Sequence, residues 1–154
     1  MKKLCLAAAA VVIAGAAGVA TMTGSPEVTH AETVKVWKSP TCGCCAAWVD
    51  HLRENGFAVE VENTAQMGQI KRSLGVPENI GSCHTARVGG YTVEGHVPAD
   101  EIARLLTEKP AVHGLSVPGM PIGSPGMEVP GARPYQVLSF TGGRTDVWSV
   151  EDPR

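Results

Sequence analysis

The spacing of apolar and polar residues predicts a β-α-β unit near the start of the folded chain. Residues 34–37 form a short apolar run typical of a buried strand, and residues 57–61 alternate between apolar and polar side chains. Between them, residues 44–55 carry apolar residues at helical spacing, and Gly56 is suited to ending that helix. The short crossover predicts parallel strands with a right-handed connection. The apolar face of the helix would consist of Trp48, Val49 and Leu52.

The pattern continues with a second helix, a hairpin and a third helix. Apolar residues recur at helical spacing over residues 64–74, and Met67 is predicted to lie in the core. Residues 85–88 and 91–94 are two predicted strands joined by a pair of glycines, which is a hairpin signal. Residues 99–107 predict the third helix. The order β-α-β-α-β-β-α predicts an α/β, thioredoxin-like domain with a central mixed sheet flanked by helices.

The C-terminal part of the chain differs in composition. Residues 112–134, the Gly/Pro segment, contain a near-repeat of Pro-Gly-Met that ends at Met120 and again at Met127. A segment of this length without regular structure is usually functional or disordered. Residues 135–140 and 145–150 then predict two further strands. We expect this β-hairpin extension either to extend the sheet or to pack over the cysteines described below.

The first 31 residues have the pattern of a secretory signal peptide. Lys2-Lys3 precedes an uncharged, Ala-rich apolar run over residues 4–20, and small residues suited to cleavage follow, the last of them Ala31. An uncleaved N-terminal anchor is the alternative. A signal peptide predicts an exported protein, periplasmic in a bacterium, with one domain over residues 32–154. No stable membrane association is expected once the signal is cleaved.

Charge and cysteine count narrow the classes of function. The 154 residues include 13 Lys or Arg and 15 Asp or Glu, for a net charge of −2. The chain has no basic run or patch, so nucleic acid is not an expected partner. An even number of cysteines in an exported domain usually indicates structural disulfides, but three within four positions is a poor layout for them. The four cysteines of the predicted mature domain are Cys42, Cys44, Cys45 and Cys83.

The strongest chemical signal is the cysteine loop, residues 37–45, with the sequence Trp-Lys-Ser-Pro-Thr-Cys-Gly-Cys-Cys. Cys42 and Cys45 have C-x-x-C spacing at a strand-to-helix turn, where backbone N–H groups and the helix dipole favour thiolate. The pattern permits a structural Cys42–Cys45 disulfide, redox catalysis or metal ligation. Cys44 favours metal ligation, because a third thiol would reshuffle an exchanging disulfide.

A second signal, Cys83-His84, directly precedes the predicted strand at 85–88. In thioredoxin-like folds this turn faces the cysteines at the helix start and normally carries a cis-proline. A thiol and an imidazole at that place suit a metal site better than a dithiol-exchange site. The alternative is a disulfide between Cys83 and a cysteine of the loop, which an oxidising compartment permits.

Three further side chains are candidate ligands. His96 lies in a Gly-His-Val-Pro loop, and Met120 and Met127 lie in irregular loops rather than on an apolar helix face. Thioether sulfur is a ligand for Cu(I) and a poor one for zinc or iron. His51 follows the cysteine loop on the helix and is predicted to face elsewhere, in solvent.

The ligand set favours copper. Clustered thiolates suit Cu(I), zinc or an iron–sulfur centre. Zinc prefers two separated C-x-x-C knuckles, and this chain has one. Iron–sulfur assembly is chiefly cytosolic. Cu(I) fits an exported protein and accepts bridging thiolates with nearby Met and His, so more than one copper ion could be held.

The sequence also resembles a known family, the CopG-type copper resistance proteins, which are distinct from the DNA-binding repressor of that name. The similarity is carried by the cysteine loop, Cys83-His84, the Gly-His-Val-Pro run at 95–98 and the two Pro-Gly-Met turns, and it covers about residues 34–150. The resemblance implies a periplasmic thioredoxin-like domain that binds copper through its cysteines and takes part in copper resistance.

Two hypotheses of different classes follow. The first is a copper-binding protein that holds Cu(I), with copper ions and other periplasmic copper-handling proteins as candidate partners. The second is an enzyme, either a thiol–disulfide or a copper oxidoreductase, that uses the C-x-x-C dithiol couple. The predicted metal ligands are Cys42, Cys44, Cys45, Cys83, His84, His96, Met120 and Met127.

Overall fold

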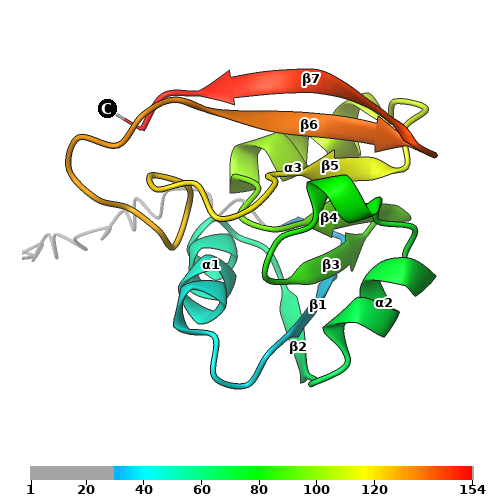
Figure 1. Ribbon diagram of the computed structural model, residues 1–154, viewed down its shortest axis with the longest axis horizontal. Helices are drawn as coiled ribbons and strands as arrows, with labels where there is room; N and C mark the ends of the chain where they lie inside the picture. Colours follow the sequence, from blue (N-terminus) through cyan, green and yellow to red (C-terminus); the bar gives the residue numbers. More distant parts are fainter. Residues whose placement is uncertain (1–29, 154) are drawn as a thin grey trace, which may run out of the picture.

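A seven-stranded mixed sheet runs through the molecule (Figure 1). The computed structural model describes residues 30–153, so the predicted signal peptide lies outside the described residues except for its last two positions. The strands are β1 (Val34–Lys38), β2 (Val59–Asn63), β3 (Thr85–Val88), β4 (Tyr91–Glu94), β5 (Gly114–Ser116), β6 (Tyr135–Thr141) and β7 (Arg144–Glu151). The helices are α1 (Gly43–Glu54), α2 (Met67–Ser73), the 3-10 turn η1 (Glu78–Ile80) and α3 (Ala99–Glu108).

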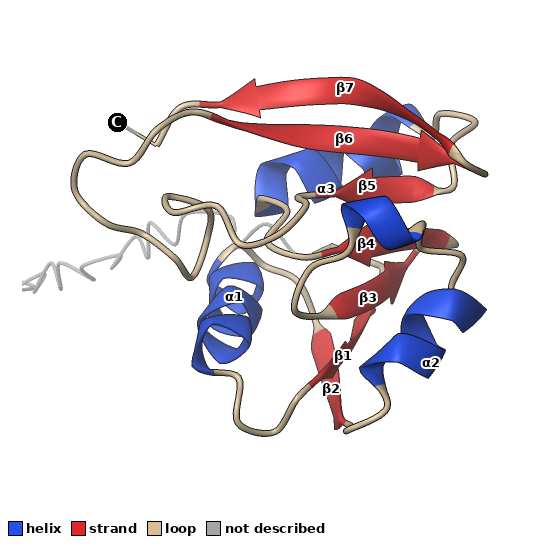
Figure 2. Cartoon of the chain, in the orientation of Figure 1, coloured by secondary structure: helices blue, strands red, loops and turns tan. Residues whose placement is uncertain are grey.

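The strand order is β2-β1-β3-β4-β5-β6-β7. β1 pairs in parallel with β2, as the short crossover through α1 predicts, and β4 pairs in parallel with β5. The other neighbouring pairs are antiparallel. The predicted α/β class with a mixed sheet and flanking helices is therefore confirmed (Figure 2), and the arrangement is compatible with a thioredoxin-like fold.

Helix α1 ends as its sequence predicts. Gly56 adopts a φ of 81°, a left-handed conformation that favours glycine. The Gly56 N–H donates to the Arg53 carbonyl at 3.0 Å, and the Phe57 N–H donates to the Leu52 carbonyl at 3.0 Å. These two bonds form a Schellman motif, which satisfies the last carbonyls of the helix and turns the chain toward β2.

The main core lies between the sheet and the helices α1 and α3. Trp48 is fully buried at its centre, and its indole N–H donates to the Val97 carbonyl at 2.8 Å. Truncation of such a buried tryptophan to alanine typically lowers the free energy of unfolding by about 3–5 kcal/mol. Trp48 therefore anchors α1 in the core. A smaller cluster consists of Val76, Ile80 and Phe140.

Helix α2 does not contribute to the core as predicted. None of its residues is buried, and Met67 is only half-buried. The helix has seven residues and contacts chiefly β1 and β3. The helical spacing of apolar residues correctly predicted the helix. The prediction that Met67 lies in the core was wrong, because so short a helix covers little of the sheet.

The C-terminal extension adds to the sheet. The predicted hairpin is present as β6 and β7, and a short strand, β5, inside the Gly/Pro segment joins it to β4. Gly114 begins β5, and a Cβ at this position would overlap the Thr92 carbonyl of the neighbouring strand. The hairpin is also fastened to α3, since the Trp148 indole donates to the Glu101 carboxylate at 2.5 Å. Within residues 30–153, no helix has the length and apolar character needed to span a bilayer.

Candidate metal centre

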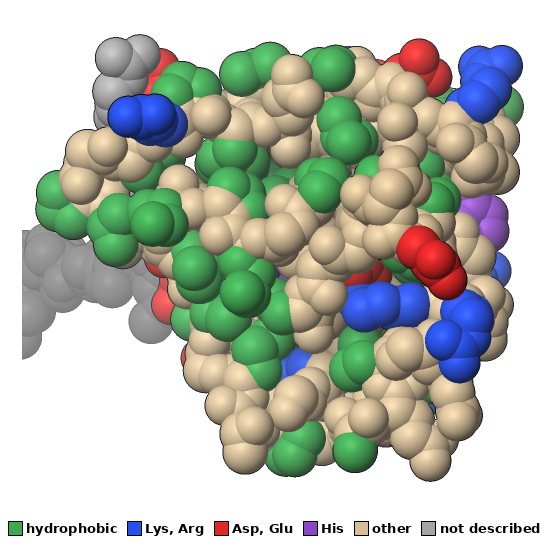
Figure 3. Space-filling model, viewed as in Figure 1, with side chains coloured by type: hydrophobic (Ala, Val, Ile, Leu, Met, Phe, Trp, Pro, Cys, Tyr) green, Lys and Arg blue, Asp and Glu red, His purple; other side chains and the backbone are tan. Residues whose placement is uncertain are grey.

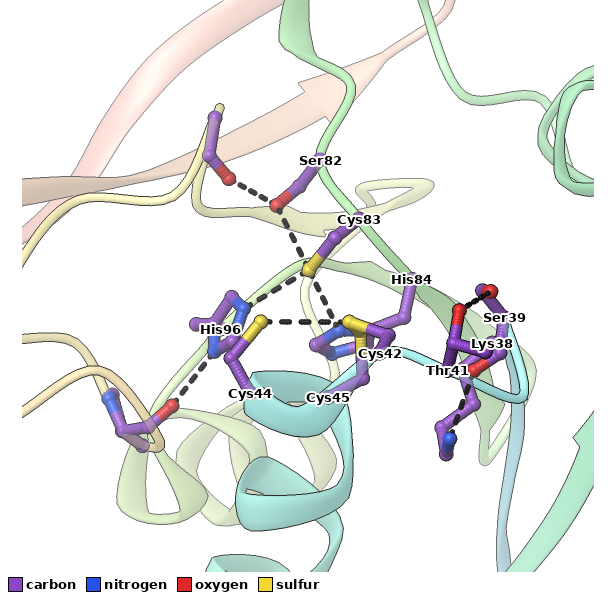
Figure 4. Close-up of a disulfide and its surroundings, with 12 residues drawn as sticks. Lys38, Ser39, Thr41, Cys42, Cys44, Cys45, Ser82, Cys83, His84 and His96 are labelled. Atoms are coloured by element: carbon purple, nitrogen blue, oxygen red, sulfur yellow. Dashed lines mark hydrogen bonds between the residues drawn. A yellow bond between two sulfur atoms is a disulfide. The ribbon is translucent and has the colours of Figure 1, made fainter.

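The sulfur atoms of the four cysteines converge at one place, the thiol cluster (Figure 4). All four ligand atoms lie within 4.8 Å of one another. Three come from the start of α1 and one from the turn before β3, two segments that the sequence predicted to face each other. The members of the thiol cluster are Cys42, Cys44, Cys45 and Cys83.

Two of the four sulfurs are joined in this structure. Cys42 and Cys45 form a disulfide, whereas Cys44 and Cys83 are free. The alternative disulfide between Cys83 and the cysteine loop is therefore not formed. The Cys44 sulfur lies 3.4 Å from that of Cys42, so a third thiol stands beside the disulfide. Oxidised protein offers two thiols at the cluster, and reduced protein would offer four.

Local structure at the start of α1 leaves this end of the helix without an acidic side chain. Cys42 is the N-cap in an extended conformation, and its N–H donates to the Ser39 carbonyl at 3.2 Å. No side chain caps the helix, and its first turn holds no acidic residue. Negative charge at this positive helix end would therefore come from the cysteines themselves, as thiolates.

The environment of Cys83 opposes ionisation of its thiol. Burial raises the pKa of Cys83 to about 11, and the neighbouring Cys44 adds to the increase. The metal-free Cys83 side chain is thus a protonated thiol at neutral pH. A soft metal ion would have to displace that proton to bind the sulfur, as metal ions do at thiolate sites.

His96 is held with one ring nitrogen aimed at Cys83. The side chain is fully buried, and its Nδ1 lies 2.7 Å from the Pro125 carbonyl. Because a carbonyl can only accept, Nδ1 carries the hydrogen and Nε2 keeps its lone pair. Nε2 lies 3.0 Å from the Cys83 sulfur. A histidine fixed through its second nitrogen in this way is the usual arrangement of a metal ligand.

His84 lies on the other side of the same sulfur. Its Nδ1 is 3.3 Å from the Cys83 sulfur, and its ring packs against Trp48 at a centroid distance of 4.3 Å. The second nitrogen, Nε2, is buried without a hydrogen-bond partner among the described residues. Burial lowers the pKa of His84 well below its usual value, and His96 adds to the effect. A neutral imidazole is the form that binds metal ions, and Cys83, His84 and His96 have ligand atoms within 4.8 Å of one another.

The first Pro-Gly-Met turn is joined to the Cys83 side of the cluster. The Gly119 N–H donates to the Gly81 carbonyl at 3.0 Å, and the Ser82 hydroxyl donates to the Gly119 carbonyl. Met120 follows directly and is 52% exposed. The structure therefore brings this turn beside the site, while metal ligation by the Met120 sulfur remains a prediction.

The second Pro-Gly-Met turn is joined to the α1 side of the cluster. Gly126 has a φ of 83°, and a Cβ on it would lie 2.7 Å from the Cys44 carbonyl oxygen and 2.8 Å from the Trp48 nitrogen. Only glycine lets the two backbones approach this closely. Met127 is therefore held beside the start of α1, and its role as a ligand also remains a prediction.

The surface around the Gly/Pro segment is largely apolar. Figure 3 shows hydrophobic side chains gathered over this segment and α1, with charged side chains near α2. Met120, Ile122 and Val129 are each about half exposed. Cys42, Cys44 and Cys83 are partly exposed, so an ion or a small thiol can reach the cluster from solvent.

Polar side chains inside the fold were missed by the sequence patterns. His51 was predicted to face solvent, but it is only partly exposed: its Nε2 accepts the Ala99 N–H at 3.1 Å and so caps α3. Glu94 is fully buried behind the Cys83 turn, paired with Lys71. The sequence signal that could have revealed Glu94 was its position as a charged residue at the end of a predicted strand.

Taken together, the mixed sheet and the converging sulfurs define a small α/β protein with a cysteine cluster that could hold a metal ion. Two solved structures of known proteins are similar to it, both titled as copper resistance protein CopG. Form 2 is 43% identical with a TM-score of 0.73, covering 79% of this chain and 98% of that chain. Form 1 is 43% identical with a TM-score of 0.72, covering 77% of this chain and 96% of that chain.

The chain belongs to the CopG family of copper resistance proteins. This bears out the resemblance seen in the sequence. A family model described as a protein of unknown function, DUF411, matches residues 80–127, which run from the Cys83 turn through the second Pro-Gly-Met turn. No curated protein sequence is significantly similar to the chain.

Proposed function

We propose that this protein binds Cu(I) in the periplasm through the reduced thiol cluster and thereby takes part in copper resistance. The observation that carries the proposal is the convergence of four cysteine sulfurs within 4.8 Å. Thiolates are soft ligands that favour Cu(I), and each can bridge two ions. Membership of the CopG family supports copper over zinc as the metal.

The other predicted ligands would complete the copper site. His84 and His96 contribute neutral imidazoles on either side of Cys83, at 3.3 and 3.0 Å from its sulfur. Met120 and Met127 would supply thioethers from the two Pro-Gly-Met turns. Export through the predicted signal peptide would bring this site to the compartment where other copper-handling proteins could deliver or accept the metal.

The proposal predicts that single cysteine substitutions abolish stoichiometric copper binding. Cys42→Ser and Cys83→Ser remove one ligand from each side of the cluster, and each should reduce bound copper to less than a tenth of the wild-type amount in the presence of a competing Cu(I) chelator. Copper per protein is measured by mass spectrometry after reduction. Thr41→Ala is the matched control, because it alters the exposed neighbour of Cys42 and leaves all four thiols. Full loading of either cysteine variant would contradict the proposal.

A second candidate is an oxidoreductase that uses the Cys42–Cys45 couple. The disulfide at the start of α1 favours this reading. Formation of the Cys42–Cys45 disulfide from two thiols releases two electrons and two protons. Two electrons can reduce two Cu(II) ions to Cu(I), or, together with the two protons, one substrate disulfide. The free Cys44, 3.4 Å from Cys42, weakens the case for disulfide exchange because it can attack the same bond.

An insulin-reduction assay separates the two functions. Turnover that is lost in Cys42→Ser would favour the thiol–disulfide oxidoreductase. Absence of turnover together with tight retention of copper by the reduced protein would favour copper binding. The same assay on Cys44→Ser shows whether the third thiol suppresses exchange, since its removal should then increase the rate.

A further inference from the structure

A buried carboxylate lies directly behind the turn that carries Cys83. Glu94 ends β4 and is fully buried, and both of its oxygens are engaged. Oε1 accepts the Ser82 backbone N–H at 2.5 Å, and Oε2 accepts the Thr85 hydroxyl at 2.6 Å. Ser82 and Thr85 are the residues on either side of Cys83-His84. One carboxylate therefore holds both ends of the Cys83 turn, residues 82–85.

A lysine from α2 neutralises this carboxylate. The Lys71 ammonium forms an ion pair with Oε1 of Glu94 and also donates to the Thr85 hydroxyl at 3.0 Å. An unpaired buried carboxylate would be strongly destabilising, so Lys71 makes the arrangement possible. The Glu94 carboxylate is fully buried and the Lys71 side chain is partly exposed, and their hydrogen bonds reach the backbone and the Thr85 hydroxyl of the turn rather than its sulfur.

From these contacts we infer that Glu94 is a positioning residue for the metal site. It fixes the backbone of the Cys83 turn so that the Cys83 sulfur lies 3.0 Å from Nε2 of His96 (Figure 4). Outer hydrogen bonds of this kind typically change metal affinity by a factor of about 10–100. The inference deepens the proposed copper function and rests on it.

The positioning role can be separated from a structural one. Replacing a buried ion pair by apolar residues of similar volume is often neutral or stabilising for the fold. The double substitution Lys71→Leu/Glu94→Leu removes both charges and the acceptors for Ser82 and Thr85. We expect a folded protein whose Cu(I) affinity, measured by competition with a chromophoric Cu(I) chelator, is about 10–100-fold weaker than that of the wild type.

Glu94→Gln is the conservative comparison. Its amide oxygen can still accept the Ser82 N–H, and its amide nitrogen can donate to the Thr85 hydroxyl. We expect it to recover most of the affinity lost in the apolar double variant. Ile102→Val in α3 is the control for reduced packing at a distance from the turn, and its copper affinity should match the wild type even if its melting temperature falls.

A site-specific readout completes the test. Reduced protein is given one equivalent of Cu(I) and treated with iodoacetamide, and alkylation at each cysteine is measured by mass spectrometry. Copper should protect Cys83 in the wild type but leave it at least fivefold more reactive in Lys71→Leu/Glu94→Leu, with Cys42 and Cys45 still protected. A purely structural role would change the protection of all cysteines in proportion to stability.

The outcomes are distinguishable. If the wild type binds copper and the folded double variant binds it equally tightly with Cys83 protected, the positioning role is wrong and the copper function stands. If the wild type binds no copper, the proposed function itself fails. Should the double variant not fold, Thr85→Val removes the Thr85 hydrogen bond to Glu94, together with the Lys71 bond to the same hydroxyl, with little change in shape. It should weaken Cu(I) binding about threefold or more, and unchanged binding would overturn the inference.

Discussion

His84 and His96 are fully buried and His51 is partly buried, and burial lowers the pKa of all three imidazoles. A neutral imidazole can accept a hydrogen bond, whereas an imidazolium cannot. His51 uses this property at the start of α3, where its Nε2 accepts the Ala99 N–H. His96 and His84 each direct a nitrogen toward Cys83. At the scale of single residues, the metal-free fold therefore favours neutral histidines.

Acid should destabilise the metal-free protein in part through His51. Its pKa is lowered in the folded state, chiefly by burial, although Glu128 and Asp100 oppose the shift. Because the unfolded chain takes up the proton first, the stabilising contribution is complete above the usual histidine pKa of about 6.5 and is lost as the pH falls below it.

Thermal unfolding measured between pH 7 and pH 5 tests the predicted direction of this pH dependence. The melting temperature of the wild type should fall over this range. His51→Gln keeps a side-chain acceptor for the Ala99 N–H but cannot be protonated, so its melting temperature should fall less. Gln69→Ala on the exposed face of α2 is the control and should follow the wild type. An equal or steeper fall in His51→Gln would contradict the account of His51 as a neutral cap.

At the scale of elements, the Gly/Pro segment links the two halves of the candidate metal site. One Pro-Gly-Met turn is bonded to the Cys83 turn through Gly119, and the other packs on α1 through Gly126. The carbonyl of Pro125 orients His96. In Figure 1 the segment passes beside α1 on its way from β5 to β6. The segment is therefore a structural part of the site and not only a connection.

Two glycines in this segment provide a matched pair for testing its close approach to α1. Gly126 and Gly131 have similar φ values of 83° and 76°, but a Cβ on Gly126 would clash with the backbone of α1, while one on Gly131 would meet no atom within 4 Å. Gly131→Ala should cost about 1 kcal/mol from backbone strain alone. Gly126→Ala should cost about 1–3 kcal/mol more, because the clash adds to the strain.

Urea unfolding and Cu(I) competition on the two variants measure both consequences. Displacement of the segment in Gly126→Ala would move the Pro125 carbonyl away from His96, so copper affinity should fall about tenfold or more. Gly131→Ala should bind copper like the wild type. If the two variants lost the same stability and the same affinity, the segment would not be held by close approach at Gly126.

The elements also show where sequence patterns suffice. Apolar spacing and Gly56 were enough to predict β1, α1 and the end of the helix at Gly56, because each depends on local sequence. The three-residue strand β5 was not predicted, since its hydrogen bonds come from β4 and β6, far away in the chain. The cysteines and histidines proposed as ligands could be chosen by their chemistry. Glu94 and the Pro125 carbonyl could not, because their partners are defined only by tertiary contacts.

At the scale of the whole molecule, a single continuous sheet connects the thiol cluster to the C-terminal hairpin. β4 and β5 join the two parts in parallel, and the hairpin is fastened to α3 by Trp148, with the Arg104 guanidinium 4.3 Å from the centre of its ring. The site is thus built from segments that are distant in sequence, on a scaffold that positions them together. Four converging sulfurs on such a scaffold form a cluster that could hold a metal ion, which under the proposed function is Cu(I) bound after reduction of the disulfide.

The most direct test of this account is X-ray absorption at the copper edge of the reduced protein loaded with copper, alongside a count of free thiols before loading. Four free thiols, copper in the Cu(I) state and a shell of sulfur ligands are the results predicted, and Cys42→Ser should retain little copper under the same conditions. Copper bound only through nitrogen and oxygen, or a reduced protein that retains no copper, would contradict the central claim.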